Sequence, residues 1–207
     1  MPGRFVTLEG GEGVGKSTQL KRLAEALRAQ GLEVVETREP GGSPGAEAIR
    51  GLLLEGADER WTPEAEALLF AAARADHVAR TIRPALERGA WVLCDRFLDS
   101  SMAYQGVAAG LGVEAIRTLH HVGSGGFLPD RTLLLELAPD AAGERLLVRD
   151  AAGSDRIGGR DGTFHGAVAA AFVRLAQEEP GRYRRIDAGG SPEEVTARLL
   201  AAVEDLL

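Results

Sequence analysis

Residues 5–18, FVTLEGGEGVGKST, join an apolar run, a glycine-rich turn and the start of an amphipathic helix. The run from Phe5 to Leu8 is apolar with two β-branched residues and predicts a buried strand. The turn ends at Gly15-Lys16-Ser17, and the leucines that follow it are spaced for one face of a helix. Gly-x4-Gly-Lys-Ser in a strand–loop–helix context is the pattern of a phosphate-binding loop. The stretch therefore predicts a site for a nucleoside triphosphate; a turn of the same shape that binds nothing is the alternative.

The residue types in this loop suit a chain of phosphates. Glycines allow successive backbone N–H groups to approach phosphate oxygens, and the helix start adds the positive end of its dipole. Lys16 is expected to reach the β- and γ-phosphates, and the Ser17 hydroxyl is expected to bind Mg²⁺. The residues expected to bind ATP are Gly10, Gly11, Glu12, Gly13, Val14, Gly15, Lys16, Ser17 and Thr18.

The composition is that of a globular protein with a sizeable core. Of the 207 residues, 44% are hydrophobic and 27% are charged. The net charge of −7 argues against a nucleic-acid surface, which is normally basic. The single cysteine, Cys94, excludes an internal disulfide, and its apolar neighbours indicate a core thiol. No apolar run approaches the length of a membrane span and residues 1–9 lack the pattern of a signal peptide, so we expect a cytoplasmic protein.

Strand and helix patterns alternate along the chain, which predicts a parallel sheet with helices on both faces, a three-layer α/β/α fold. In such sheets ligands bind outside the carboxyl ends of the strands. We therefore expect the glycine-rich loop, Arg38-Glu39 and Asp95-Arg96 to lie at one edge. Pro84 is expected to kink or interrupt the longest helix. Strands are expected at 5–8, 32–38, 91–95, 131–137 and 183–187, and helices at 16–30, 46–54, 63–88, 100–108, 113–121, 140–149, 164–177 and 192–207.

Further segments of the chain resemble a single family. They are TREPGGSPGAEAIR (37–50), LLFAAARADHV (68–78), DRFLDSSMAYQG (95–106) and DRIGGRDGTF (155–164). In this order, together with the phosphate-binding loop, they resemble bacterial thymidylate kinase, a family of P-loop nucleoside monophosphate kinases. The resemblance covers nearly the whole chain, from Arg4 to about Ala188. It implies one P-loop kinase domain over residues 1–207, with a five-stranded parallel sheet and a mobile lid at about 150–162.

The resemblance also implies a reaction and its partners. The γ-phosphoryl group of ATP would pass to dTMP, giving dTDP and ADP for dTTP synthesis, with Mg²⁺ as cofactor. The implied partners are therefore ATP and dTMP, without nucleic acid or membrane. The family is typically homodimeric, and the apolar stripe in residues 64–78 is a candidate contact between copies.

Catalysis of such a transfer needs charge neutralisation rather than a strong base. The acceptor phosphate is already largely ionised near neutral pH, so two anions must be held in line while positive groups neutralise the transferring phosphoryl. By resemblance, Arg96 and Arg50 bind the acceptor phosphate, and Asp95 binds Mg²⁺ with Ser17 or orients Arg96. Positions 11–14 include no basic residue, so the resemblance assigns the charge in the transition state to the lid arginines. The implied catalytic residues are Lys16, Asp95, Arg96, Arg149, Arg156 and Arg160.

An acceptor pocket is implied in the same way. Phe70 and Arg74 are spaced to share one helical face, and they would stack on thymine and donate to a ring carbonyl. Ser101 and Gln105 have the same spacing and resemble residues that read the pyrimidine edge. A role in the core is the alternative for Phe70. The implied dTMP-binding residues are Glu12, Glu39, Arg50, Phe70, Arg74, Arg96, Ser101, Tyr104 and Gln105.

Two segments depart from the family's pattern, and other functions remain open. Ala108 and Ala109 stand where a glycine and an arginine are usual, and Gly158 stands where an acid is usual. A kinase for another nucleoside monophosphate or a small metabolite is the main alternative, because the loop alone does not identify the acceptor. An ATP-dependent binding or assembly module is the non-enzymatic alternative. A GTP-hydrolysing switch is disfavoured, since no lysine follows Lys21 and the guanine-reading Asn-Lys-x-Asp motif is missing.

Overall fold

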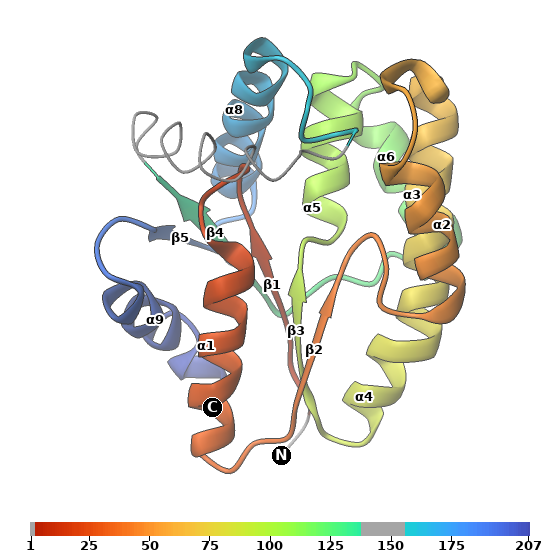
Figure 1. Ribbon diagram of the computed structural model, residues 1–207. Helices are drawn as coiled ribbons and strands as arrows, with labels where there is room; N and C mark the ends of the chain where they lie inside the picture. Colours follow the sequence, from red (N-terminus) through yellow and green to blue (C-terminus); the bar gives the residue numbers. More distant parts are fainter. Residues whose placement is uncertain (1–2, 138–155) are drawn as a thin grey trace.

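The computed structural model describes residues 3–137 and 156–207, without the side chain of Asp58. Figure 1 shows a central sheet with helices packed on both of its faces. The helix expected at 140–149 lies outside the described residues, as does the part of the expected lid before residue 156.

Parallel strands form the sheet: β1 (Phe5–Glu9), β2 (Val34–Arg38), β3 (Trp91–Asp95), β4 (Arg131–Glu136) and β5 (Tyr183–Asp187). Their order is β2-β3-β1-β4-β5, so β1 lies at the centre. At the carboxyl ends, Leu8 is in register with Asp95, and Asp95 is in register with Arg38. The loops that follow β1, β2 and β3 therefore leave the same edge of the sheet. The predicted five-stranded parallel sheet is confirmed.

Helices join the strands and are labelled as in Figure 1. The longer ones are α1 (Lys16–Ala29), α2 (Pro44–Leu54), α3 (Pro63–His77), α6 (Val113–Ser124), α8 (Gly162–Glu178) and α9 (Pro192–Ala201). The shorter ones are α4 (Arg83–Glu87) and α5 (Leu98–Ser101), the π-helical segments η2 (Val78–Ile82) and η3 (Met102–Ala108), and the 3₁₀ segments η1 (Asp58–Arg60) and η4 (Glu204–Leu206). Among the described helices, none combines the length and the apolar character that crossing a bilayer requires.

Side-chain alternation along β1 divides the core into two layers. Val6 and Leu8 point toward the face covered by α1 and α9, where they join Leu23 and Leu27. Phe5 points toward the opposite face, which the α3–α4 segment, η3 and α8 cover. Because successive residues of a strand face opposite sides, Thr7 and Glu9 lie on the same side as Phe5. Glu9 is thereby buried beneath the segment that follows β3.

Pro84 does not end the helical segment, although the hydrogen bonding changes just before it. α3 is followed by the π-helical turn η2, in which the Arg83 N–H donates to Val78 O, and then by α4. A proline removes one backbone donor and crowds the preceding turn, and here the turn before Pro84 is a π-turn, so the segment stays helical with altered hydrogen bonding. The interruption predicted at Pro84 therefore takes the form of a change from α-helix to π-helix and back, and the segment remains helical throughout.

Other boundaries differ by a few residues for local reasons. β2 begins at Val34 rather than residue 32, because the Leu32 N–H still donates to Leu27 O in the turn that closes α1. α2 begins two residues early, at Pro44, since the Ser43 hydroxyl accepts from the Ala46 N–H and caps it. The segment expected to be helical from residue 100 begins at Leu98 and is π-helical from Met102. The last helix ends at Ala201 and is followed by η4.

Leu27 offers a test of the layer between α1 and the sheet. Its side chain is fully buried, so Leu27→Ala should lower the free energy of unfolding by about 2–5 kcal/mol through lost transfer energy and an unfilled cavity. Urea unfolding followed by circular dichroism measures the change. The same substitution at the exposed Leu207 is the control and should change stability by less than about 0.5 kcal/mol. An equal effect of both substitutions would contradict this packing.

Candidate active site

The loop between β1 and α1 forms the first part of the site. Gly10 has φ 137°, and a Cβ there would lie 2.4 Å from Leu135 O, so only glycine fits. Gly15, with φ 91°, precedes α1 and turns the backbone into the helix. The Lys16 ammonium donates to Gly10 O at 3.1 Å and to Gly11 O at 2.6 Å, across the mouth of the loop. Burial, reinforced by the positive charge of Arg96, lowers the pKa of Lys16 to about 8.

A depression over this loop is bordered by Gly13, Lys16, Ser17 and Thr18 on one side and by the end of β3 and the residue after it on the other. Within it, Ser17 Oγ donates to Asp95 Oδ2 at 2.6 Å. A hydroxyl and a carboxylate are hard oxygen ligands of the kind that Mg²⁺ takes, usually as one or two protein groups beside phosphates and water. The residue types and their closeness fit that metal.

Arg96 holds an unusual backbone conformation at the end of β3. Its φ is 68°, in the left-handed region that non-glycine residues rarely adopt. Its N–H donates to Leu8 O at 3.0 Å, and the Cys94 thiol donates to its carbonyl at 3.0 Å. The guanidinium donates to Gly10 O at 3.1 Å and to Glu12 Oε1 at 2.5 Å. The turn therefore aims the side chain back across the phosphate-binding loop.

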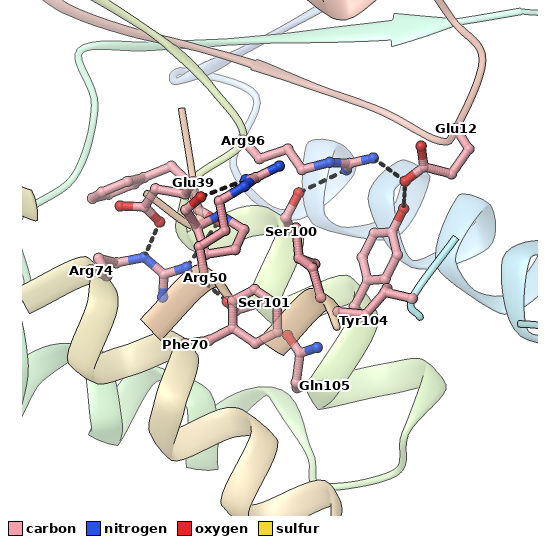
Figure 2. A pocket seen from close by; sticks show the side chains of 14 residues that line it. Glu12, Glu39, Arg50, Phe70, Arg74, Arg96, Ser100, Ser101, Tyr104 and Gln105 are labelled. Carbon is pink, nitrogen blue, oxygen red and sulfur yellow. Dashed lines mark hydrogen bonds and ion pairs between the residues drawn. The ribbon is translucent and has the colours of Figure 1, made fainter. Parts of the chain in front are cut away.

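A second pocket lies beside the loop, and Figure 2 shows the side chains that line it. Glu12 and Arg96 border both this pocket and the depression over the loop. Tyr104 completes the boundary, because its hydroxyl donates to Glu12 Oε1 at 3.1 Å and its ring lies under the Arg96 guanidinium at 5.1 Å. The lining residues are Glu12, Glu39, Pro40, Arg50, Leu54, Phe70, Arg74, Arg96, Phe97, Ser100, Ser101, Tyr104, Gln105 and Ile157.

All nine residues expected to bind the acceptor by resemblance border this second pocket. They come from the phosphate-binding loop, the segment after β2, α2, α3, the segment after β3, α5 and η3. In Figure 2, Arg96 and Glu12 lie at one end of the pocket, and Phe70 and Gln105 lie at the other. The pocket thus has a charged end beside the loop and an aromatic end away from it.

Arg74 is fixed in the pocket wall by buried partners. Its guanidinium donates to Glu39 Oε2 at 2.7 Å and to Ser101 Oγ at 2.7 Å. His77, one turn further along α3, lies 3.0 Å from the other Glu39 oxygen. Sequence reasoning missed His77, although its position three residues after Arg74 places it on the same helical face. Arg50 donates to the carbonyl oxygen of Pro40, the residue after Glu39, at 2.6 Å.

Two arginines of the segment expected to form a lid converge on a carboxylate in α3. Arg156 and Arg160 both donate to Glu66 Oε2, at 2.5 and 2.8 Å. Gln105 donates to the other oxygen of Glu66 at 2.9 Å. Sequence reasoning missed Glu66, because it reads as one of several acids at the start of an amphipathic helix. Arg149 lies outside the described residues.

Glu9 supports Arg96 from beneath the site. Its carboxyl group accepts from the Phe97 N–H at 2.7 Å and from Ser100 Oγ at 2.6 Å, and Ser100 Oγ in turn accepts from Arg96 at 3.0 Å. Complete burial, reinforced by the charge of Asp99, raises the pKa of Glu9 to about 7. Sequence reasoning missed this residue as well, since it reads as the polar end of an apolar strand.

A phosphate-binding loop after the central strand of a five-stranded parallel sheet, with a second pocket at the same edge, is the arrangement of a P-loop kinase. A family model described as Thymidylate kinase matches residues 8–199. The chain therefore belongs to the thymidylate kinase family, which confirms the resemblance found in the motifs.

Individual relatives agree with this assignment. The chain is 70% identical over 207 residues to a thymidylate kinase of Rhizorhabdus wittichii, with all of both chains covered. It is 47% identical to one of Bradyrhizobium diazoefficiens, over 99% of this chain and 90% of the relative. Among solved structures, it is similar to a thymidylate kinase from Ehrlichia chaffeensis, with a TM-score of 0.80 and 29% identity over 98% of this chain and 100% of the other.

The raised pKa of Glu9 predicts a pH-dependent stability that Glu9→Gln removes. The folded protein keeps Glu9 protonated up to about pH 7, whereas the unfolded chain ionises it near 4.5. The free energy of unfolding contributed by Glu9 therefore falls as pH rises through this window, by up to about 1.4 kcal/mol per pH unit. Urea unfolding of both proteins from pH 4.5 to 7 should show the variant gaining stability relative to the wild type. A difference independent of pH would contradict the burial of an ionisable Glu9.

Proposed function

We propose that this chain transfers the γ-phosphoryl group of ATP to dTMP, giving dTDP and ADP for dTTP synthesis. The observation that carries the proposal is the shared boundary of the two pockets, where one guanidinium, that of Arg96, borders both. A triphosphate in the loop and a monophosphate in the second pocket would bring their phosphates together at Arg96. Family membership supports the identity of both substrates.

The loop residues would hold the donor. Backbone N–H groups of residues 10–18 would surround the β-phosphate, and the Lys16 ammonium would leave the loop carbonyls for the charged γ-phosphate oxygens, which are stronger acceptors. Ser17 and Asp95 would hold Mg²⁺, which when bound neutralises charge on the β- and γ-phosphates. Asp95 also directly precedes Arg96 in the chain, so it would link the metal beside the donor to the arginine that binds the acceptor phosphate.

The second pocket would hold the acceptor with its phosphate at the charged end. Arg96 and Arg50 would bind that phosphate, and Tyr104 and Glu12 would face the sugar. Phe70 would stack on the thymine ring, while Arg74, Ser101 and Gln105 would bind the edge of the base. Arg74 is held by Glu39 and Ser101 before any base arrives, which lowers the entropy lost on binding.

Lid arginines would supply the remaining charge. The loop offers no basic residue at positions 11–14, so Arg149, Arg156 and Arg160 are the candidates to neutralise the transferring phosphoryl group. Arg156 and Arg160 are paired with Glu66, which favours Arg149 for this role. We take the lid as residues 150–162 of a single kinase domain spanning 1–207, and we propose that it closes over the phosphates and excludes water. An arginine in this role is worth on the order of 10³–10⁵ in rate in well-studied enzymes.

We further propose that the protein is a cytoplasmic homodimer, as is typical of the family, with the apolar stripe of α3 in residues 64–78 contributing to the contact. Leu68 of that stripe is 56% exposed, so it is available for a contact with a second copy. Sedimentation equilibrium measures the state directly. We expect no nucleic-acid or membrane partner.

The direct test is ADP release from Mg²⁺-ATP with a panel of acceptors. dTMP should stimulate release most, dUMP should follow because one methyl group is worth only about 1–3 kcal/mol, and dCMP and purine monophosphates should be poor. A higher rate with another acceptor would overturn the choice of dTMP. No stimulation by any acceptor would favour a binding module over a kinase.

Arg96→Lys tests the role given to the shared guanidinium. Lysine keeps the charge but lacks the two parallel donors that match a phosphate, so kcat with dTMP should fall at least about tenfold. The KM for ATP should change by less than about threefold, because the loop itself is intact. Arg88→Lys, at an exposed ion pair with Glu33 that lies 2.8 Å away, is the matched control. Turnover equal to that of the wild type would exclude the assigned role.

A further inference from the structure

Glu66 lies behind the wall of the acceptor pocket and is hydrogen-bonded to Gln105, which lines that pocket. Its side chain is only 2% exposed, and that of Arg156, its closest partner, is 1% exposed. One carboxylate oxygen accepts from both lid arginines, and the other accepts from Gln105 Nε2 at 2.9 Å. Glu66 thus forms ion pairs with two guanidinium groups through one oxygen. The group therefore presents only acceptors to Gln105.

This charge fixes which way round the Gln105 amide lies. A glutamine amide has almost the same shape after a rotation of 180° that exchanges its oxygen and its nitrogen. Beside a carboxylate, the rotated amide would place oxygen against oxygen and lose a charge-assisted hydrogen bond. Gln105 itself is 1% exposed and borders the pocket. One N–H of the Gln105 amide thus donates to Glu66. The amide oxygen lies on the other side of the amide group, next to the second N–H.

The orientation matters because thymine and cytosine present opposite patterns at the same positions. Thymine carries a ring N–H donor next to a carbonyl acceptor, whereas cytosine carries a ring nitrogen acceptor next to an amino donor. An amide locked in one orientation matches one of these patterns. An amide free to rotate can match either of them by exchanging its oxygen and nitrogen.

We propose that Glu66 is a positioning residue that locks the Gln105 amide in the orientation that reads thymine and thereby excludes cytosine from the acceptor pocket. The inference rests on the proposed function, since it takes a pyrimidine monophosphate as the acceptor. Glu66 touches no substrate in this account. It acts through Gln105, and the two lid arginines keep it charged.

Glu66→Gln tests the lock. The new amide can donate to the Gln105 oxygen as well as accept from its nitrogen, so both orientations of Gln105 become possible. The ratio of kcat/KM for dTMP to kcat/KM for dCMP should fall at least about fivefold relative to the wild type. Both acceptors share ATP, the phosphate-binding arginines and the lid, so the ratio is unaffected by changes in those parts or by a fraction of inactive enzyme.

The controls separate this effect from a loss of structure. Glu64→Gln, an exposed acid on the same helix, should leave the ratio unchanged. Glu66→Asp retains the charge needed by Arg156 and Arg160 but is one methylene shorter, so it cannot reach the arginines and Gln105 together. This variant should also lower the ratio at least about fivefold, and it carries the test if Glu66→Gln does not fold.

The outcomes distinguish this inference from the proposed function. A wild type that releases ADP with dTMP, together with variants whose ratio changes less than fivefold, would overturn the role of Glu66 and leave the kinase assignment intact. A wild type that shows no dTMP-dependent release would overturn the proposed function itself, and the inference with it.

Discussion

The position of Arg96 between two pockets is the constraint on which the rest of the site depends. Its left-handed backbone is fixed by a hydrogen bond to Leu8 O in the neighbouring strand, and its guanidinium by Gly10 O, Glu12 and Ser100. Such a conformation persists only where the surroundings over-determine it. The ends of β1 and β3 thereby fix the position of the Arg96 guanidinium, which borders both the depression over the phosphate-binding loop and the second pocket.

Carboxylates organise the other cations of the site in the same manner. Glu39 holds Arg74, and Glu66 holds Arg156 and Arg160, in each case with little exposure to solvent. A buried ion pair of this kind adds little net stability, because desolvation offsets much of the attraction between the charges. A buried ion pair instead holds hydrogen-bond donors in position before a ligand arrives. Enzymes that transfer phosphoryl groups gain rate in this way without a strong base. The buried charged groups of this fold therefore orient side chains and add little to its stability.

Periodicity and motif spacing predicted the strands, the phosphate-binding loop and the edge at which the site forms. These features depend on residues close together in the chain, such as the run Phe5–Leu8 and the glycines that follow it. The partners that orient the site are far apart in sequence: Glu66 meets Arg156 across 90 residues, and Glu9 meets Ser100 across 91. No local pattern distinguishes those acids from exposed ones. The π-helical segments were also missed, since apolar spacing does not separate them from ordinary helix.

The central claim is that two nucleotides meet end to end at Arg96, and a compound that joins them tests it most directly. Thymidine and adenosine linked through a chain of five phosphates should span both pockets, with the chain passing the Arg96 guanidinium. Steady-state inhibition should then be competitive against ATP and also competitive against dTMP. Inhibition that is competitive against one substrate and noncompetitive against the other would contradict a single continuous site.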